Sequence, residues 1–296
     1  MRHILPGMNT STSAGAVLLI HCPDKQGIVA AVTSFLHRHQ GNITELDQHV
    51  DHRINRFFMR VKWELAAFTL SREEISSTFV SELGEPFDME WHLHFTDKPL
   101  RLGIFVSKLS HCLYDILQRY VSSEWNIEIP LIISNHPDLA PIAKRYDIPY
   151  HIMPINRENK REQEKQELAL LKEADVDLVI LARYMQVLTS QMTDQFPDRV
   201  INVHHSFLPA FAGARPYHQA YYRGVKLIGA TSHFVTEVLD EGPIIAQEVA
   251  SITHKDDVKD LVRKGRDLEK FVLSQAIWFH HEHRVMRYGN RTIIFQ

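Results

Sequence analysis

The sequence predicts an α/β protein in which a small unit of βαββαβ order precedes a doubly wound, mostly parallel sheet. Three observations support this prediction. The chain has 296 residues, and at about 150 residues per domain this length favours two domains. Strand-like and helix-like segments follow the split βαββαβ order as far as residue 97. From residue 100 strands alternate with helices, as in a parallel sheet. We therefore predict domains at 15–97 and 100–296.

The elements of the first domain follow from the spacing of apolar residues. Apolar residues recur at i, i+3 and i+4 within 27–36, which predicts an amphipathic helix. Ser71 and Glu74 form a capping-box pattern that predicts the start of a second helix. Four segments have the apolar runs or the alternation of strands: 16–22, 43–50, 57–65 and 89–95.

The second domain contains a longer series of alternating elements. A helix at 256–281 and a short strand at 292–295 are predicted to end the chain. The charged segment 156–165 is interpreted as the solvated face of a helix rather than as an anion-binding patch. Six strands are predicted for the sheet: Arg101–Ser107, Ile127–Ser134, Pro149–Ile152, Asp177–Ala182, Val200–Val203 and Lys226–Val235.

Composition excludes several classes of protein. The formal net charge of −3 offers no basic field for nucleic acid or an anionic membrane. The two cysteines, Cys22 and Cys112, are too few for a disulfide framework or a thiolate zinc site, which fits a reducing compartment. His280 and His283 have helical spacing but no third ligand, so no metal site is expected. Without a secretory or membrane-spanning segment, a cytoplasmic protein is predicted.

Polar groups gather where two predicted strands end. Asn202 and His204 are two residues apart, so both side chains lie on the same face of an extended chain. Ligands of open parallel sheets bind beyond the carboxyl ends of the strands. Asp240 lies in a turn beside Gly242 and Pro243. An amide, an imidazole and a carboxylate in one cleft are groups that can attack a carbonyl and stabilise the oxyanion.

Several motifs resemble those of known families. The segments Asn202–His204, Ser206–Pro209, His233–Val235 and Leu239–Ile244 resemble the signature of the folate-dependent formyltransferases. The segments His204–Tyr221, Gly265–Lys270 and Tyr288–Ile294 are similar to the branch of that family that hydrolyses 10-formyltetrahydrofolate to tetrahydrofolate and formate. The segments Cys22–Val29, Gly41–Ile43 and Arg56–Arg60 resemble an ACT domain, a small-ligand sensor usually fused to metabolic enzymes.

This resemblance implies roles for particular residues. Asn202, His204 and Asp240 correspond to the catalytic set of the family, and the folate is the substrate, so no separate cofactor is expected. His233 is expected to orient Asp240, and the backbone of Val235–Leu239 to recognise the pterin edge. Four apolar side chains are expected to line the pterin pocket: Leu181, Met185, Val187 and Leu188.

One departure from the family bears on the acceptor of the formyl group. Members that formylate a phosphorylated amine have a glycine-rich turn after the first catalytic strand, where backbone N–H groups hold phosphate. This chain has no glycine between Gly103 and His111. If no phosphorylated acceptor binds, the remaining acceptor is water, and Ser107 and Lys108 stay candidates for holding an anion. The segment Arg215–His218 is equally consistent with binding the glutamate tail of folate and with packing a loop.

The hypothesis is a hydrolase in which Asp240 binds a water, directly or through a relay, and accepts its proton. Asn202 and a protonated His204 would stabilise the oxyanion, and His204 would protonate the departing nitrogen. His205 is expected to point to the opposite face of the strand. Two alternatives stay open: a formyltransferase with an amine acceptor, and a folate or amino-acid sensor without turnover.

The first domain adds an expectation of regulation. Asp24, Gly27 and Asn42 are candidates for an amino-acid effector site, although such domains also serve only to build dimers. A homo-oligomer is expected in either case. The cellular role implied is the return of folate to the unformylated pool, with formate supplied to purine synthesis.

Overall fold

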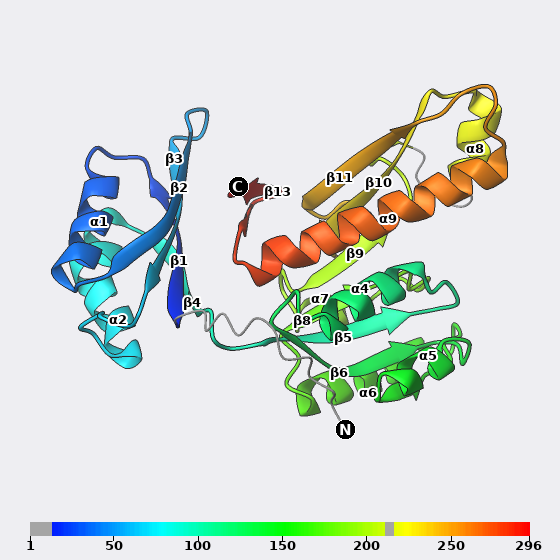
Figure 1. The fold of residues 1–296 in the computed structure, drawn as a ribbon, viewed down its shortest axis with the longest axis horizontal. Helices are drawn as coiled ribbons and strands as arrows, with labels where there is room; N and C mark the ends of the chain where they lie inside the picture. The colour runs from blue at the N-terminus through cyan, green and yellow to red at the C-terminus, as the bar shows by residue number, and fades with distance from the viewer. Residues whose placement is uncertain (1–13, 211–215) are drawn as a thin grey trace. The chain divides into compact units, whose positions relative to one another are not determined.

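The computed structural model describes residues 14–210 and 216–296. The chain separates into two compact units, one that ends at Lys98 and includes Phe295–Gln296, and one that runs from Pro99 to Ile294 (Figure 1). Each unit has its own hydrophobic core and is described by itself. No helix among the described residues is both long enough and apolar enough to cross a membrane.

The first unit is a four-stranded antiparallel sheet of order β2-β3-β1-β4, with its helices on one face (Figure 1). This is the predicted βαββαβ order, with a π-helical turn between α2 and α3. The predicted capping box opens α2, since Ser71 N donates to Glu74 Oε2. The elements are β1 (Gly15–Pro23), α1 (Ile28–Arg38), β2 (Asn42–Asp51), β3 (Arg56–Glu64), α2 (Arg72–Phe79), η1 (Val80–Gly84), α3 (Glu85–Phe87) and β4 (Glu90–Phe95).

The three candidate effector residues do not come together in one chain. Asp24 follows β1 at the end that pairs with Arg56, and Gly27 precedes α1 at the same end. Asn42 instead pairs with Glu64, at the other end of β3. Eight residue steps of about 3.3 Å separate the ends of β3, a span of about 26 Å. The prediction of a single amino-acid site formed by all three residues of one chain is therefore wrong.

The second unit is built on a seven-stranded sheet. All six predicted strands are present, and their ends lie within one residue of the predicted ones. The elements are β5 (Leu100–Val106), α4 (His111–Val121), β6 (Ile127–Ser134), α5 (Ala140–Arg145), β7 (Tyr150–Ile152), α6 (Lys160–Glu173), β8 (Leu178–Leu181), α7 (Ser190–Thr193), β9 (Val200–His204), α8 (Pro216–Arg223), β10 (Leu227–Phe234), β11 (Ile244–Ser251), α9 (Val258–His281), β12 (Val285–Tyr288) and β13 (Arg291–Ile294).

The strand order β11-β10-β9-β8-β5-β6-β7 places β9 between a parallel and an antiparallel neighbour. Strands β5 to β9 run parallel, whereas β10 is antiparallel to both β9 and β11. Strand β11 was not predicted, because its sequence has neither a continuous apolar run nor a strict alternation. At this edge of the sheet the end of β9 pairs with the middle of β10, and the end of β10 pairs with the start of β9.

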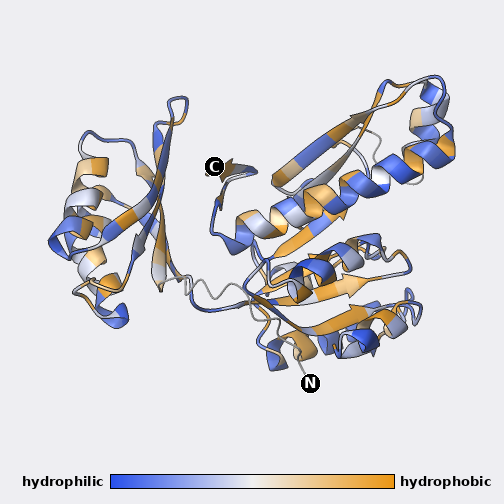
Figure 2. Ribbon diagram, viewed as in Figure 1, coloured by the Kyte–Doolittle hydropathy of each residue, from blue (hydrophilic) through white to orange (hydrophobic). Residues whose placement is uncertain are grey.

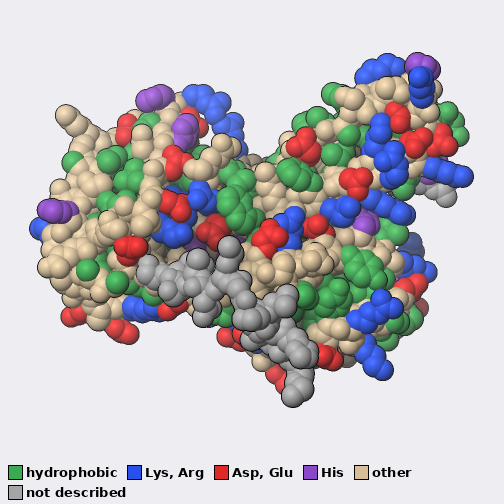
Figure 3. All heavy atoms as spheres, viewed as in Figure 1, with side chains coloured by type: hydrophobic (Ala, Val, Ile, Leu, Met, Phe, Trp, Pro, Cys, Tyr) green, Lys and Arg blue, Asp and Glu red, His purple; other side chains and the backbone are tan. Residues whose placement is uncertain are grey.

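Helices cover both faces of the larger sheet, as expected for a doubly wound fold. One core packs α4, α5, α8 and α9 against the sheet, and the other packs α6 and α7 against the opposite face. The apolar residues concentrate in strands such as β5, β6 and β9 (Figure 2). On the face shown in Figure 3, acidic and basic side chains are interspersed, in keeping with the small net charge.

The charged segment at the start of α6 is not simply a solvated helix face. Glu164 is only 1% exposed and Glu167, one turn later, is completely buried. Both carboxylates turn inward because they accept hydrogen bonds from the segment that follows β8. The prediction of a solvated face was therefore wrong at Glu164.

Candidate active site

The antiparallel pairing of β9 and β10 brings together the residues predicted from the sequence. In this register Asn202 pairs with His233 and His204 pairs with Thr231. The amide Nδ2 of Asn202 lies 3.3 Å from Nε2 of His233. The side chains of His204 and His233 are buried, whereas Asn202 keeps some exposure. The β9–β10 edge therefore forms one wall of a polar site.

Asp240 reaches this wall from the turn between β10 and β11. Its backbone has φ +57°, in the left-handed region that Asp and Asn enter more readily than most residues. The turn is tight, because a Cβ built on Gly242 would lie 1.7 Å from the carbonyl oxygen of Phe234. Only glycine permits this close approach. The turn thus holds the Asp240 carboxylate against the end of the sheet.

The carboxylate of Asp240 lies between two imidazoles. Its Oδ2 is 3.2 Å from Nδ1 of His204, and its Oδ1 is 3.7 Å from Nε2 of His233. Hydrogen bonding by His204, and then by His233, holds the pKa of Asp240 well below its usual range, although partial burial opposes this shift. Asp240 is therefore ionised throughout the physiological pH range.

His233 contacts its neighbours through both ring nitrogens. Nδ1 of His233 donates to the carbonyl oxygen of Phe234 at 2.9 Å, since that oxygen can only accept. Nε2 of His233 lies 3.3 Å from Nδ2 of Asn202 and 3.7 Å from Oδ1 of Asp240, so it faces both groups. His233 consequently contacts Asn202 as well as Asp240, whereas the sequence suggested only Asp240.

One nitrogen of His204 is left for other chemistry. With Nδ1 on Asp240, Nε2 is buried and has no hydrogen-bond partner among the described residues. The neighbouring ring of His205 lies 4.9 Å away, centroid to centroid. Burial, together with the charge of Arg183, lowers the pKa of His205 to about 4. His205 is therefore neutral and adds no second charge beside His204.

The apolar residues expected to bind the pterin ring divide into two kinds. Leu181 and Leu188 belong to the core packed against α6 and α7. Met185 and Val187 are 59% and 47% exposed and lie on the surface of the segment after β8. Val235 packs against the same core. Only Met185 and Val187 among the four expose much apolar surface to a ligand.

The segment after β5 offers no free hydroxyl for an anion at Ser107. Its Oγ donates to Oδ1 of Asn135 at 2.7 Å and accepts from the backbone N of Met185 at 3.1 Å. Ser107 is only 3% exposed. These bonds are internal to the protein, which strengthens the argument against a phosphate cradle at this turn.

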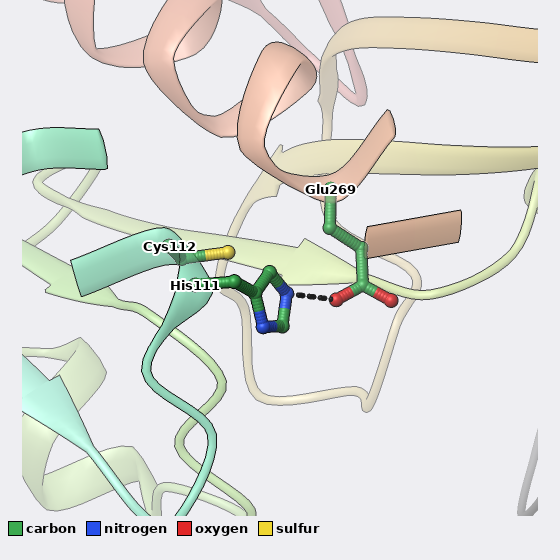
Figure 4. Close-up of side chains that lie close together, drawn as sticks. All are labelled: His111, Cys112 and Glu269. Atoms are coloured by element: carbon green, nitrogen blue, oxygen red, sulfur yellow. Dashed lines mark hydrogen bonds and ion pairs between the residues drawn. The ribbon is translucent and has the colours of Figure 1, made fainter. Parts of the chain in front are cut away.

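A second polar cluster, missed from the sequence, surrounds Glu269 of α9 (Figure 4). Its Oε2 lies 2.7 Å from Nε2 of His111 and 3.4 Å from Nε of Arg183, and its Oε1 accepts from the hydroxyl of Tyr217 at 2.7 Å. Burial alone would raise the pKa of Glu269, but these three partners lower it below its usual value. The only sequence signal was the Gly265–Lys270 motif, to which no role was attached.

This cluster does not fit a metal site well. Cys112, His111 and Glu269 place possible ligand atoms within 4.8 Å of one another (Figure 4). Arg183, however, already supplies a positive charge to the Glu269 carboxylate. Burial raises the pKa of the Cys112 thiol well above its usual value, which disfavours the thiolate that a metal requires.

The residues suggested for the glutamate tail are only partly described. Arg215 lies outside the described residues. His218 lines an open groove of about 520 Å³ along α9, together with His111 and basic residues of that helix. The lining of this groove includes none of Asn202, His204 and Asp240.

Comparison with known proteins agrees with both units. A formyl transferase family model matches residues 100–277, and an ACT domain model matches residues 16–62. The formyltetrahydrofolate deformylase of Synechocystis is 54% identical over 280 residues, covering 95% of this chain and 98% of that protein. The Bacillus subtilis deformylase is 45% identical and covers 94% and 93%.

Solved structures show the same relationship. The crystal structure of a formyltetrahydrofolate deformylase from Pseudomonas syringae superposes with a TM-score of 0.94 at 41% identity, over 97% of this chain and 96% of that one. The chain therefore belongs to the formyltetrahydrofolate deformylases, enzymes that hydrolyse 10-formyltetrahydrofolate to tetrahydrofolate and formate.

Proposed function

We propose that Asn202, His204 and Asp240 carry out this hydrolysis. The observation that supports the proposal most strongly is the pairing of Asp240 with Nδ1 of His204, which leaves the buried Nε2 without a partner among the described residues. A carboxylate on one ring nitrogen fixes the tautomer and directs the other nitrogen towards the reaction. Water is the acceptor, and an amine acceptor is not favoured.

In the proposed reaction, water attacks the formyl carbon and its proton passes to the Asp240–His204 pair. The depressed pKa of Asp240 makes it a weak base by itself, so the relay through His204 is favoured over direct proton abstraction. The amide of Asn202 and the Nε2–H of His204 stabilise the oxyanion. Collapse of the intermediate breaks the bond to the folate nitrogen, which takes the proton, and formate leaves.

Met185 and Val187 are proposed to contact the pterin ring. They lie after β8, at the same carboxyl edge of the parallel sheet at which β9 ends. Their exposed side chains offer apolar surface for a flat ring. Leu181 and Leu188 would support this surface from the core, and the backbone from Val235 onwards would meet the pterin edge.

The catalytic proposal is tested with Asp240→Asn. The variant removes the carboxylate charge but keeps a residue that accepts the left-handed backbone. Purified protein is mixed with 10-formyltetrahydrofolate without any amine, and tetrahydrofolate and formate are measured together. We expect wild type to release both in equal amounts, and the variant to turn over about 10²–10⁴ times more slowly with folate still bound. Near-normal turnover by the variant would refute the mechanism.

The cellular context is also a proposal. The enzyme would act in the cytoplasm, where its two buried free cysteines stay reduced. It would return folate to the unformylated pool and release formate for purine synthesis. The ACT unit makes an amino-acid effector and a homo-oligomer reasonable. Because Asp24 and Asn42 lie at opposite ends of β3, an effector site would use one end of the sheet or residues of a second copy. Sedimentation with and without glycine or methionine tests whether the chain forms an oligomer and whether either amino acid changes its size.

A further inference from the structure

Helix α6 carries two buried carboxylates that the proposed mechanism does not use. Glu164 is 1% exposed and Glu167 is 0% exposed. Burying a carboxylate is costly unless hydrogen bonds compensate for the lost water. Both side chains direct their oxygens at residues 182–189, the segment we name the pterin loop.

Glu164 holds the end of the pterin loop. Its Oε1 accepts from the backbone N of Thr189 at 3.0 Å, and its Oε2 accepts from the hydroxyl of the same residue. Thr189 is also the N-cap position of α7. One carboxylate therefore binds both donors of a single residue and fixes where the loop stops.

Glu167 holds the start of the loop. The hydroxyl of Tyr184 donates to its Oε1 at 3.2 Å. The Tyr184 ring is 5% exposed and packs edge-on against Phe105 of β5, with the ring centroids 5.2 Å apart. A hydrogen bond between two buried groups constrains the Tyr184 ring and, through it, the backbone of the next residue.

Between these two points the backbone is fixed but two side chains are not buried. The backbone N of Met185 donates to Ser107 Oγ at 3.1 Å. Met185 and Val187 nevertheless remain 59% and 47% exposed. An apolar side chain on a fixed backbone can meet a ligand without a further loss of loop entropy.

We propose that Glu164 and Glu167 are positioning residues for folate binding, which hold the pterin loop so that Met185 and Val187 present a preformed apolar surface to the pterin ring. This inference depends on the proposed role of Met185 and Val187. The two acids do not touch the reacting atoms. They act on the affinity for substrate rather than on the chemical step.

The experiment compares KM and kcat for 10-formyltetrahydrofolate in four variants. Glu167→Ala and Tyr184→Phe each remove one hydrogen bond, so we expect KM to rise about three- to tenfold while kcat stays within about twofold. Glu167→Gln keeps an oxygen that accepts from Tyr184, and we expect it to restore KM. Glu162→Gln is the matched control, because Glu162 is an exposed acid on the same helix, 3.7 Å from Lys165.

Two further variants, Met185→Ala and Val187→Ala, separate the inference from the proposed function. Met185→Ala changes an exposed side chain and keeps the loop anchors. If Met185→Ala raises KM but Tyr184→Phe leaves it unchanged, the positioning role is refuted and the pterin contact stands. If Met185→Ala and Val187→Ala both leave KM unchanged, the pterin contact itself is refuted. Should Glu167→Ala fail to fold, Tyr184→Phe, which loses only a hydroxyl, decides the question.

Discussion

Asp240 and Glu269 are two carboxylates with histidine partners in the same unit, yet their surroundings differ. Asp240 is 16% exposed in its side chain, and Nε2 of its partner His204 has no hydrogen-bond partner in the described part of the chain. Glu269 is 2% exposed, and an arginine, a histidine and a tyrosine occupy both of its oxygens. An incompletely satisfied group next to solvent can exchange protons with a substrate, whereas a saturated buried one ties elements together. The comparison predicts chemistry at Asp240 and stability from Glu269.

The largest effect expected is on stability, from Glu269→Ala. Removing this carboxylate leaves Arg183 buried and without its charge partner, which typically costs about 3–5 kcal/mol. Chemical unfolding at pH 7 measures the loss, and kcat per folded molecule should change little. A stable variant with strongly reduced kcat would instead place Glu269 among the catalytic groups and break the comparison.

Asn202→Ala should cost a comparable free energy, but in catalysis rather than in stability. Loss of one oxyanion donor lowers kcat about 10²–10³-fold, or about 2.7–4 kcal/mol, with the melting temperature nearly unchanged. Steady-state kinetics measure kcat, and calorimetry on the same preparation measures the melting temperature. The control is His233→Gln, whose side chain can still accept from Asn202 and should fall between wild type and Asn202→Ala.

Glu167 extends the comparison, because it is buried like Glu269 but pairs with no arginine among residues 14–210 and 216–296. Burial raises its pKa from 4.5 to about 7, although the bond from Tyr184 opposes this shift. A raised carboxyl pKa favours folding below about pH 4.5, and this contribution is lost as the pH rises through about 7. Relative to Glu167→Gln, the wild type should thus lose about 3 kcal/mol between these two pH values. Unfolding free energies of both proteins across this range supply the test, and parallel profiles would contradict it.

Gly265→Ala should produce the smallest effect. A Cβ built on Gly265 would lie 2.1 Å from the hydroxyl of Tyr217, the donor to Glu269. The ring must move, and such overpacking costs about 1–3 kcal/mol. Adding Tyr217→Phe should not recover that cost, because ring carbons Cζ and Cε1 of Tyr217 would lie 2.2 and 2.4 Å from the new Cβ and remain in the variant. Thermal unfolding of the single and double variants measures this.

The sequence predicted those features that periodicity and turn chemistry encode. The buried strands of the larger sheet are apolar runs bounded by polar residues, so their ends were placed within one residue. Asn202 and His204 lie in the last three residues of β9 and Asp240 lies in a turn, and the Asp240 carboxylate meets His204 as expected.

Features that depend on tertiary packing were not predictable in this way. Glu164 and Glu269 are acids in helices rich in charge, and nothing in their spacing distinguishes them from solvated neighbours. Their burial depends on donors far along the chain, such as Thr189 and Tyr217. Likewise Asp24 and Asn42 both flank strands, and only the register of β3 shows that they lie at opposite ends.

The left-handed backbone at Asp240 narrows the set of substitutions that report on catalysis alone. At φ +57°, alanine or a branched side chain adds conformational strain to the loss of the carboxylate. An Asp240→Ala variant would therefore overstate what the charge contributes. Asparagine tolerates this conformation and has almost the same shape, so it isolates the charge. The same restriction acts on natural variation: few residues satisfy the backbone at this position, and of those only aspartate also supplies a carboxylate.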